Sequence, residues 1–257
     1  MLTGTKLVRS TILFILLFAL GCGGEKKEEA PKPEAATAEP TGTSAIAGTV
    51  NFTGKARRGA RLRMNADPVC LKQHTKPVYG EAVVVNDNKT LRHVLVYVTD
   101  GLGGRKYDPP QEKVIFDQKS CLYTPHVLGI QVGQEFEVRN SDPTLHNVHS
   151  LSKENRPFNI AQPKQGMTFT RKFEKPERFR VKCEVHPWMS AYVGVFTHPF
   201  YAVTGDDGTF KIKDLPAGEY TVEAWHEKYG AQTMKVTVGE ADTTTVEFTY
   251  GGTQPGA

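Results

Sequence analysis

The chain has 257 residues, of which 39% are hydrophobic and 23% charged, and its formal net charge is +4 at pH 7. This length suffices for one large domain or two small ones. Without Lys6 and Arg9, which precede an apolar N-terminal run, the charge falls to +2. The remaining basic residues are scattered along the sequence, so nucleic acid is not an expected partner.

The first 22 residues have the pattern of a targeting segment. Lys6 and Arg9 are followed by an apolar run, residues 12–20, that is too short to span a bilayer. Residues 19–22, Ala-Leu-Gly-Cys, resemble a bacterial lipoprotein signal with Cys22 as the lipidated residue. An ordinary secretory peptide cleaved near Gly21 is the alternative. We predict a signal peptide over residues 1–22.

A lipid on Cys22 would anchor the protein to a membrane without a spanning helix. The predicted location is therefore the cell envelope, facing the periplasm, and Gly23 in place of an Asp after Cys22 favours the outer membrane. Residues 23–44 are rich in Glu, Lys, Ala, Pro and Thr and have almost no large apolar side chains. Such a composition cannot bury a core, so this segment is predicted to be a disordered linker.

Short strands account for most of the remaining sequence. Runs rich in Val with period-two alternation are separated by turn signals such as Asp100-Gly101 and Gly103-Gly104. No long amphipathic helix stands out, which predicts an all-β fold built as a β-sandwich over residues 45–198. The expected strands are residues 47–52, 82–85, 91–98, 113–117, 135–140, 167–173, 178–182 and 192–196.

A second, smaller β-sandwich is predicted over residues 199–250. Its expected strands are residues 210–213, 221–225, 235–238 and 243–248, with Gly-containing turns between them. So few residues give a marginal core. We therefore expect this unit either to pack on the first one or to borrow the strand at residues 47–52 to complete its sheet.

The most informative motif is Cys183-Glu-Val-His186-Pro-Trp-Met189, with His146 upstream. Two His, one Cys and one Met are the ligands of a blue-copper site, and a Met is not an expected zinc ligand. A short loop between two strands can turn Cys183, His186 and Met189 toward one point. His146 would then complete the set from a neighbouring strand. Because residues 146 and 149 have opposite parity in a strand, His149 is expected to face away from the metal.

These motifs resemble the cupredoxin family over residues 83–197, most closely its amicyanin and plastocyanin-like members. The resemblance implies a Greek-key β-sandwich that holds one type 1 copper through His146, Cys183, His186 and Met189. It also implies that Asn147 braces the ligand loop, that His186 lies at the solvent edge as the electron exit, and that the partner is a redox protein, either a cytochrome or a dehydrogenase or oxidase.

The C-terminal unit resembles the carboxypeptidase regulatory-like β-sandwich. The motif is Thr-Gly-Asp-x-Gly-x-Phe at residues 204–210, followed by Leu-Pro-x-Gly-x-Tyr at residues 215–220. Residues 46–50 look like the first strand of such a domain. The cupredoxin-like unit is therefore either followed by the regulatory-like unit or inserted within it, and both arrangements stay open. The resemblance implies an accessory role without catalysis.

Cys70 and Cys121 are left after Cys22 and Cys183 are assigned. In an exported protein a disulfide between them is expected, closing a 51-residue loop. The alternative is a second metal site in which His74 and His126 join the two thiolates. The segment around Cys70 and His74 has no counterpart in a minimal cupredoxin.

The leading hypothesis is a membrane-tethered, periplasmic electron carrier with one blue copper. The alternatives are a copper-handling lipoprotein for storage or delivery, and a cell-envelope interaction protein with an incidental copper site. No enzyme activity is expected, since the sequence has no second copper site of nitrite-reductase type and no Ser/His/Asp set.

Overall fold

The computed structural model describes residues 42–55 and 58–251. The predicted signal peptide and all but residues 42–44 of the predicted linker lie outside the described residues. Within 42–55 and 58–251, helices that combine the length and the apolar character needed to cross a membrane are absent. Almost all of the regular secondary structure in the described part of the chain is β-strand, and the predicted all-β class is confirmed.

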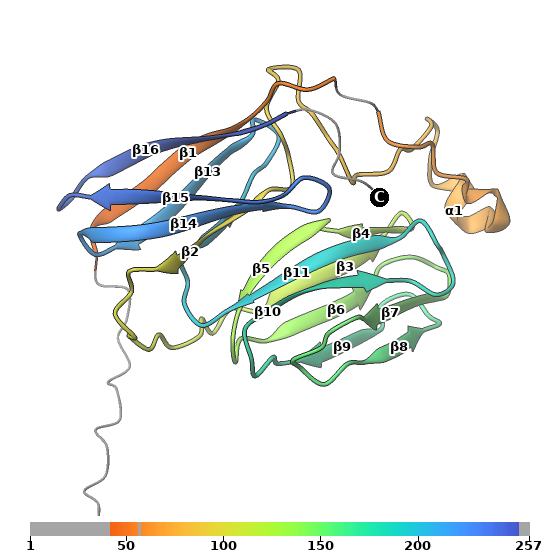
Figure 1. Cartoon of the computed structure of the whole chain (residues 1–257). Coiled ribbons are helices and arrows are strands. Elements are labelled where there is room, and N and C mark those ends of the chain that lie inside the picture. Colours follow the sequence, from red (N-terminus) through yellow and green to blue (C-terminus); the bar gives the residue numbers. More distant parts are fainter. Residues whose placement is uncertain (1–41, 56–57, 252–257) are drawn as a thin grey trace, which may run out of the picture. The chain divides into compact units, whose positions relative to one another are not determined.

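Two sheets built from residues 114–196 form one sandwich, here called the insert sandwich (Figure 1). One sheet has the order β5-β11-β10-β7-β8 and the other β4-β3-β6-β9. Their strands are β3 (Val114–Lys119), β4 (Leu122–Thr124), β5 (Val127–Gln131), β6 (Phe136–Asn140), β7 (His146–Ser150), β8 (Asn159–Gln162), β9 (Thr168–Arg171), β10 (Glu177–Lys182) and β11 (Ser190–Phe196).

A second pair of sheets forms the host sandwich, with the orders β13-β1-β16 and β12-β2-β14-β15. The strands of this sandwich come from both ends of the described chain. They are β1 (Ser44–Phe52), β2 (Leu95–Asp100), β12 (Tyr201–Val203), β13 (Thr209–Leu215), β14 (Gly218–His226), β15 (Gly230–Val238) and β16 (Thr243–Tyr250).

The strands form where apolar side chains alternate. In β6, Phe136 and Val138 are buried and pack in one cluster with Phe116 of β3 and with Val181 and Val193 of the opposite sheet. The host sandwich has a cluster of its own, to which β1, β2, β13, β14, β15 and β16 all contribute. Each sandwich therefore closes around one core, as period-two burial requires.

Strand pairing follows the nested arrangement rather than the tandem division at residues 198 and 199. β1 pairs antiparallel with β13 and in parallel with β16, and β2 pairs with both β12 and β14. The C-terminal unit thus takes residues 44–52 into its sheet. This agrees with the expectation that it borrows the strand at residues 47–52. The insert sandwich leaves the host after β2 and returns to it at β12.

Several predicted strand positions need correction. Residues 82–85 form no strand and make only one isolated bridge, between Val85 and Leu91. The sequence pattern also missed β4, β5, β8 and β12, whereas β7 was expected from the placement of His146 and His149 on a strand. In β5 the apolar run is interrupted by Gly129, where the ring of Tyr201 packs so closely that a Cβ would lie 2.3 Å from it. That glycine accommodates a close contact and does not mark a turn.

Residues 58–80 form a covering segment, which we call the cap. Its two ends lie side by side, because Leu62 N donates to Val78 O at 2.9 Å and Gly80 N donates to Ala60 O at 2.9 Å. Between them lie the 3-10 turn η1 (Met64–Ala66) and the helix α1 (Pro68–Lys72). Asp67 caps α1 by accepting from Val69 N, and Pro68 occupies the first turn, where no backbone donor is needed.

Candidate metal centre

Three predicted donors come together at one end of the insert sandwich. His146 is the first residue of β7, and Cys183 directly follows β10. His186 lies in the loop that joins β10 to β11. Pairing of β7 with β10, through Lys182 and His149, brings the start of one strand beside the end of the other.

The donor atoms face one another in a buried space. Nδ1 of His146 lies 3.0 Å from Nδ1 of His186, and Sγ of Cys183 lies 3.9 Å from the latter atom. One ligand atom from each of the three residues falls within 4.8 Å of the others. His146, Cys183 and His186 are 0%, 3% and 2% exposed. Two imidazole nitrogens and one free sulfur at this spacing fit a copper ion, for which this set is suited.

The ligand loop closes on itself through its backbone. Cys183 N donates to Met189 O at 3.1 Å, and Met189 N donates to His186 O at 2.9 Å. His186 N also points to Cys183 Sγ at 3.3 Å. Met189 is 1% exposed and packs in the same core cluster as Cys183. Residues 183–189 therefore form a short loop whose two ends are joined by a backbone hydrogen bond.

The surroundings of Cys183 favour its thiolate. Burial opposes ionisation, but hydrogen bonds from His146, His186 and the amides of His186 and Val185 outweigh it. Together they lower the pKa of the thiol from 9.0 to about 6. A thiolate is the form that binds a metal. The site therefore holds its sulfur ligand in the competent state at neutral pH.

The carboxylate of Asp142 contacts the nitrogen of His146 that faces away from the other donors. This Nε2 atom lies 2.8 Å from Oδ2 of Asp142, which is itself 1% exposed. The same carboxylate accepts from the amides of Ser120 and Cys121, both at 2.7 Å. Those two residues have positive φ angles of 54° and 53° in the turn between β3 and β4. Asp142 therefore orients the imidazole. It also stabilises a left-handed turn, a backbone conformation that is unfavourable for residues other than glycine.

These contacts shift the proton equilibria of the pair. Burial raises the pKa of Asp142, but its hydrogen bonds to His146 and to the two amides lower it overall. For His146, burial lowers the pKa, while the contacts with Asp142 and Cys183 raise it overall. The pair thus favours a proton on Nε2 of His146, which leaves Nδ1 for a metal.

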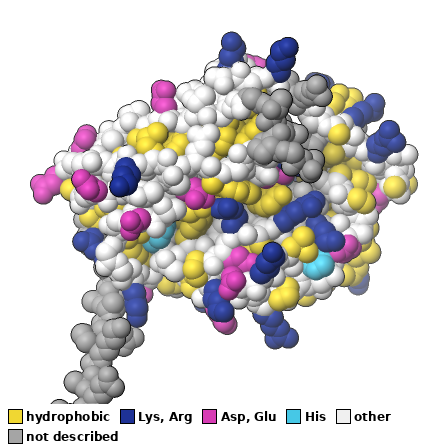
Figure 2. All heavy atoms as spheres, in the orientation of Figure 1, with side chains coloured by type: hydrophobic (Ala, Val, Ile, Leu, Met, Phe, Trp, Pro, Cys, Tyr) yellow, Lys and Arg dark blue, Asp and Glu magenta, His cyan; other side chains and the backbone are white. Residues whose placement is uncertain are grey.

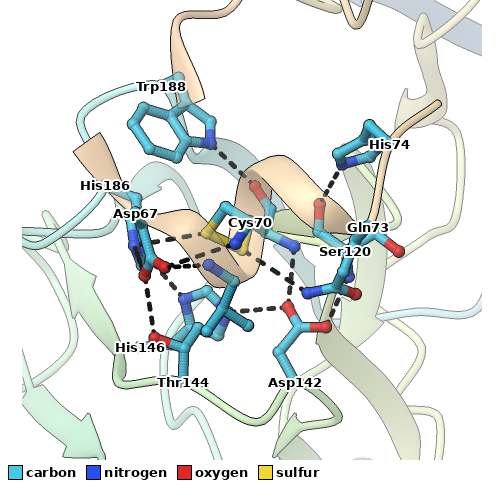
Figure 3. Close-up of a disulfide and its surroundings, with 12 residues drawn as sticks. Asp67, Cys70, Gln73, His74, Ser120, Asp142, Thr144, His146, His186 and Trp188 are labelled. Atoms are coloured by element: carbon cyan, nitrogen blue, oxygen red, sulfur yellow. Dashed lines mark hydrogen bonds and ion pairs between the residues drawn. A yellow bond between two sulfur atoms is a disulfide. The ribbon is translucent and has the colours of Figure 1, made fainter. Parts of the chain in front are cut away.

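His186 has a carboxylate partner from the cap. Its Nε2 lies 3.1 Å from Oδ2 of Asp67, and that oxygen also accepts from Thr144 Oγ1 at 2.9 Å. Burial opposes ionisation of Asp67, yet these bonds and the α1 amides lower its pKa overall. Figure 3 shows His186 beside Asp67 and His146 beside Asp142. Both histidines therefore present Nδ1 to the site and Nε2 to an acid.

Cys70 and Cys121 form a disulfide, as expected for an exported protein. Sγ of Cys70 lies 3.6 Å from Nε2 of His186, and Trp188 donates from Nε1 to Cys121 O at 2.9 Å (Figure 3). The second metal site considered from the sequence is not formed. His74 binds the carbonyl of Ser120 at 2.7 Å, and His126 pairs with Glu227 at 2.5 Å.

The position of His186 corrects one expectation. The resemblance to cupredoxins placed this imidazole at the solvent edge, but here it is only 2% exposed. Asp67 and Cys70 of the cap lie against its outer nitrogen, and the Trp188 ring lies 5.0 Å from its ring. The cap thus lies where solvent was expected.

The other two polar residues singled out in β7 contact the ligand loop at its edge. Asn147 accepts at Oδ1 from the amide of Glu184, the residue after Cys183, at 3.1 Å. His149 points to the carboxylate of Glu184, with Nδ1 and Oε1 2.5 Å apart, and is half-buried. His149 therefore lies outside the group of three donors.

Sequence reasoning missed both carboxylates. Asp142 stands four residues before His146, within the Ser-Asp-Pro sequence of residues 141–143, so its spacing was a usable signal. Asp67 followed by Pro68 is a recognisable helix start. Nothing in its local sequence, however, relates it to His186, which is 119 residues away.

Comparison with known proteins gives partial likenesses. The model of the carboxypeptidase regulatory-like domain family matches residues 187–251. That range contains β12–β16 of the host sandwich and also β11 of the insert sandwich. No curated protein sequence matches the chain.

Among solved structures the chain is similar to cupredoxins. A copper-containing nitrite reductase from Thermus scotoductus is 22% identical, with a TM-score of 0.32, over 38% of this chain and 25% of its own. A Cu(I) amicyanin mutant is 21% identical, with a TM-score of 0.29, over 32% and 81%. A purple cupredoxin from Nitrosopumilus maritimus is 26% identical, with a TM-score of 0.27, over 32% and 97%.

Both resemblances expected from the motifs are therefore found. The chain spans about a quarter of the length of the nitrite reductase. Because every one of these TM-scores is below 0.5, the case for a metal comes from the donor atoms themselves.

Proposed function

We propose that this protein carries single electrons and holds one type 1 copper between Nδ1 of His146, Nδ1 of His186 and Sγ of Cys183, with Met189 as the fourth ligand. The observation that carries the proposal is the convergence of these three buried donors, each imidazole backed by a carboxylate. Bound copper would supply one-electron chemistry between its Cu(I) and Cu(II) states.

The residues around the donors suit an electron carrier because they keep the donors in place. The loop from Cys183 to Met189 is closed by its own backbone bonds, and Asp142 and Asp67 fix the two imidazoles. A site that moves little when its charge changes has little reorganisation to undergo. Burial of all three donors also keeps water and chelators away, which supports electron transfer over copper delivery.

The cellular setting belongs to the same proposal. We propose a periplasm-facing protein of the cell envelope, tethered to the membrane, preferably the outer one, by a lipid on Cys22. The Cys70–Cys121 disulfide supports an oxidising compartment. The partner would be a redox protein, either a cytochrome or a dehydrogenase or oxidase, and the protein itself would not be an enzyme.

The test is the visible and EPR spectrum after one equivalent of Cu(II) is added to the protein. We expect an intense thiolate-to-copper band and a small copper hyperfine splitting. Cys183→Ser should abolish the band, because the thiolate is its source. His149→Gln is the matched control, since His149 lies on the same strand as His146 but outside the donor group.

A band that survives in Cys183→Ser would refute the assignment. A pale wild-type protein with an ordinary tetragonal copper signal would instead favour copper handling or an incidental site.

A further inference from the structure

The cap carries an unbalanced surface charge. Within residues 58–80 the exposed charged side chains are all cations, namely Arg58, Arg61, Arg63, Lys72 and Lys76. Its single carboxylate, Asp67, is turned inward to His186. None of the five cations forms an ion pair with any residue in the ranges 42–55 and 58–251. Arg58 stacks on the ring of Tyr79, with Cζ 3.6 Å from the ring centroid. The charges of the other four are therefore available to a partner.

The same surface is hollowed and partly apolar. A depression of about 580 Å³ is lined by Arg61 and Arg63 together with apolar side chains, and Leu71, 53% exposed, forms part of its wall. Dark blue and yellow side chains occur together at the right of Figure 2, where Figure 1 places α1. Apolar side chains next to arginines are typical of a protein interface.

This surface belongs to the element that contacts the candidate metal centre. Met64 lines the depression and belongs to the same core cluster as Cys183 and Met189. On the inner side of the cap, Asp67 and Cys70 contact Nε2 of His186 at 3.1 and 3.6 Å. Only the cap therefore separates a partner seated here from the imidazole.

We propose that the cap is the docking surface for the acidic face of a redox protein, with Arg61 and Arg63 pairing with its carboxylates around an apolar contact at Leu71. The guanidinium group suits carboxylates because it can bond both oxygens at once. Complementary charge would also speed the encounter and orient the partner over His186. This inference rests on the proposed electron-carrier function, since it takes the partner to be a redox protein.

An acidic protein fits these observations better than an anionic membrane does. The depression is concave and its two arginines stand in its wall, where a protruding carboxylate-bearing segment can enter. A flat bilayer surface would leave the depression empty. Binding of lipid is therefore an outcome of the test that would overturn the proposal.

The experiment uses cytochrome b5, an acidic electron carrier, as the probe. Reduced cytochrome b5 gives one electron to the Cu(II)-loaded full chain, and its haem iron becomes ferric. The rate is followed by haem absorbance in stopped flow at low and at physiological ionic strength. We expect the second-order rate constant to fall steeply with salt and to drop at least about tenfold in the triple variant Arg61→Glu, Arg63→Glu, Lys72→Glu.

The matched control reverses three exposed cations of the host sandwich, Lys211→Glu, Lys213→Glu and Lys235→Glu, and changes the total charge equally. It should change the rate constant less than about twofold, because these residues are outside the cap. Equal losses in the two variants would overturn the proposal, since net charge alone would then explain the effect.

A binding measurement distinguishes failure of this proposal from failure of the proposed function. Calorimetry with the metal-free full chain measures docking of cytochrome b5 without any copper chemistry. Binding that is lost only in the cap variant supports the docking surface even if the copper spectrum fails to appear. No binding of cytochrome b5, together with cap-dependent binding to vesicles of phosphatidylglycerol and phosphatidylethanolamine, would overturn it in favour of a membrane contact.

Discussion

At the scale of single residues, the centre is organised as two imidazoles, each with one nitrogen toward the donor group and one toward an acid. Asp142 and Asp67 thereby decide which nitrogen of His146 and of His186 is free. Outer partners of this kind orient ligands and raise their basicity. Cys183 completes the group as a thiol that ionises easily.

The first prediction concerns the titration of Cys183 in the metal-free protein. Its pKa in the folded state is about 6, against an ordinary 9.0, so thiolate absorbance at 240 nm should develop around pH 6. The folded chain loses this proton more readily than the unfolded chain does. The contribution of this group to stability is therefore complete above pH 9 and is lost as the pH falls toward 6.

The measurement is the difference in 240-nm absorbance between the wild type and Cys183→Ser from pH 4.5 to 8.5. The variant should give a flat trace over this range. A wild-type midpoint near pH 8.5 would contradict the hydrogen-bonded environment described for the sulfur.

Site residues that lie close together in the sequence could be predicted, whereas a residue far from them in the sequence could not. Cys183, His186 and Met189 lie within seven residues, so their spacing alone indicated a shared ligand loop. Strand parity then distinguished His146 from His149. Asp67 could not be reached in this way, because its contact with His186 exists only once the cap has folded over the insert sandwich.

At the scale of elements, the cap and its disulfide form one unit. Cys70 lies in α1, and Cys121 lies in the left-handed turn whose amides Asp142 holds. One covalent bond therefore joins the element that contacts His186 to the turn that supports the acid behind His146. Sequence composition predicted the bond but gave no indication that it would lie against the metal centre.

The second prediction is that the double variant Cys70→Ser, Cys121→Ser unfolds more easily. The disulfide closes a loop with a sequence separation of 51 residues. The loss in the free energy of unfolding should be about 4 kcal/mol in the chain-entropy model. Denaturant unfolding measures this loss, and hydrogen exchange of the cap amides should become faster at the same time.

Wild-type protein treated with a reductant is the control, and it should reproduce the behaviour of the double variant. An unchanged midpoint together with unchanged protection of the cap amides would show that the cap holds its place without the bond.

At the scale of the whole molecule, two sandwiches with separate cores share one chain in a nested order. The all-β class and the regulatory-like motif could be predicted from alternation and turn residues. The nesting could not be decided, because residues 44–52 have the same alternating pattern whichever sheet they join. The pairing of β1 with β13 on one side and with β16 on the other settles their place.

The third prediction uses this separation of cores. Ile46 on β1 is fully buried in the host cluster, and Ile46→Ala should cost about 2–5 kcal/mol there. The thiolate-to-copper band should remain, since its donors belong to the insert cluster. Faster hydrogen exchange should be confined to the strands of the host sandwich, β1, β2 and β12–β16, and the exposed Lys211→Ala on β13 is the control. Loss of the copper band at the same denaturant concentration would contradict independent cores.

The parallel pairing of β1 with β16 also determines the order in which the two sandwiches can fold while the chain is being synthesised. β1 ends at Phe52, which is 198 residues before Tyr250, the last residue of its partner strand. Until that partner strand exists, the insert sandwich can fold from contacts entirely within itself, whereas β1 remains a strand with open edges. Long-range pairing of this kind is slow to form. The host sandwich should therefore be the last part of the chain to mature, and a chain cut off before residue 243 should carry a finished insert on an unfinished, aggregation-prone host.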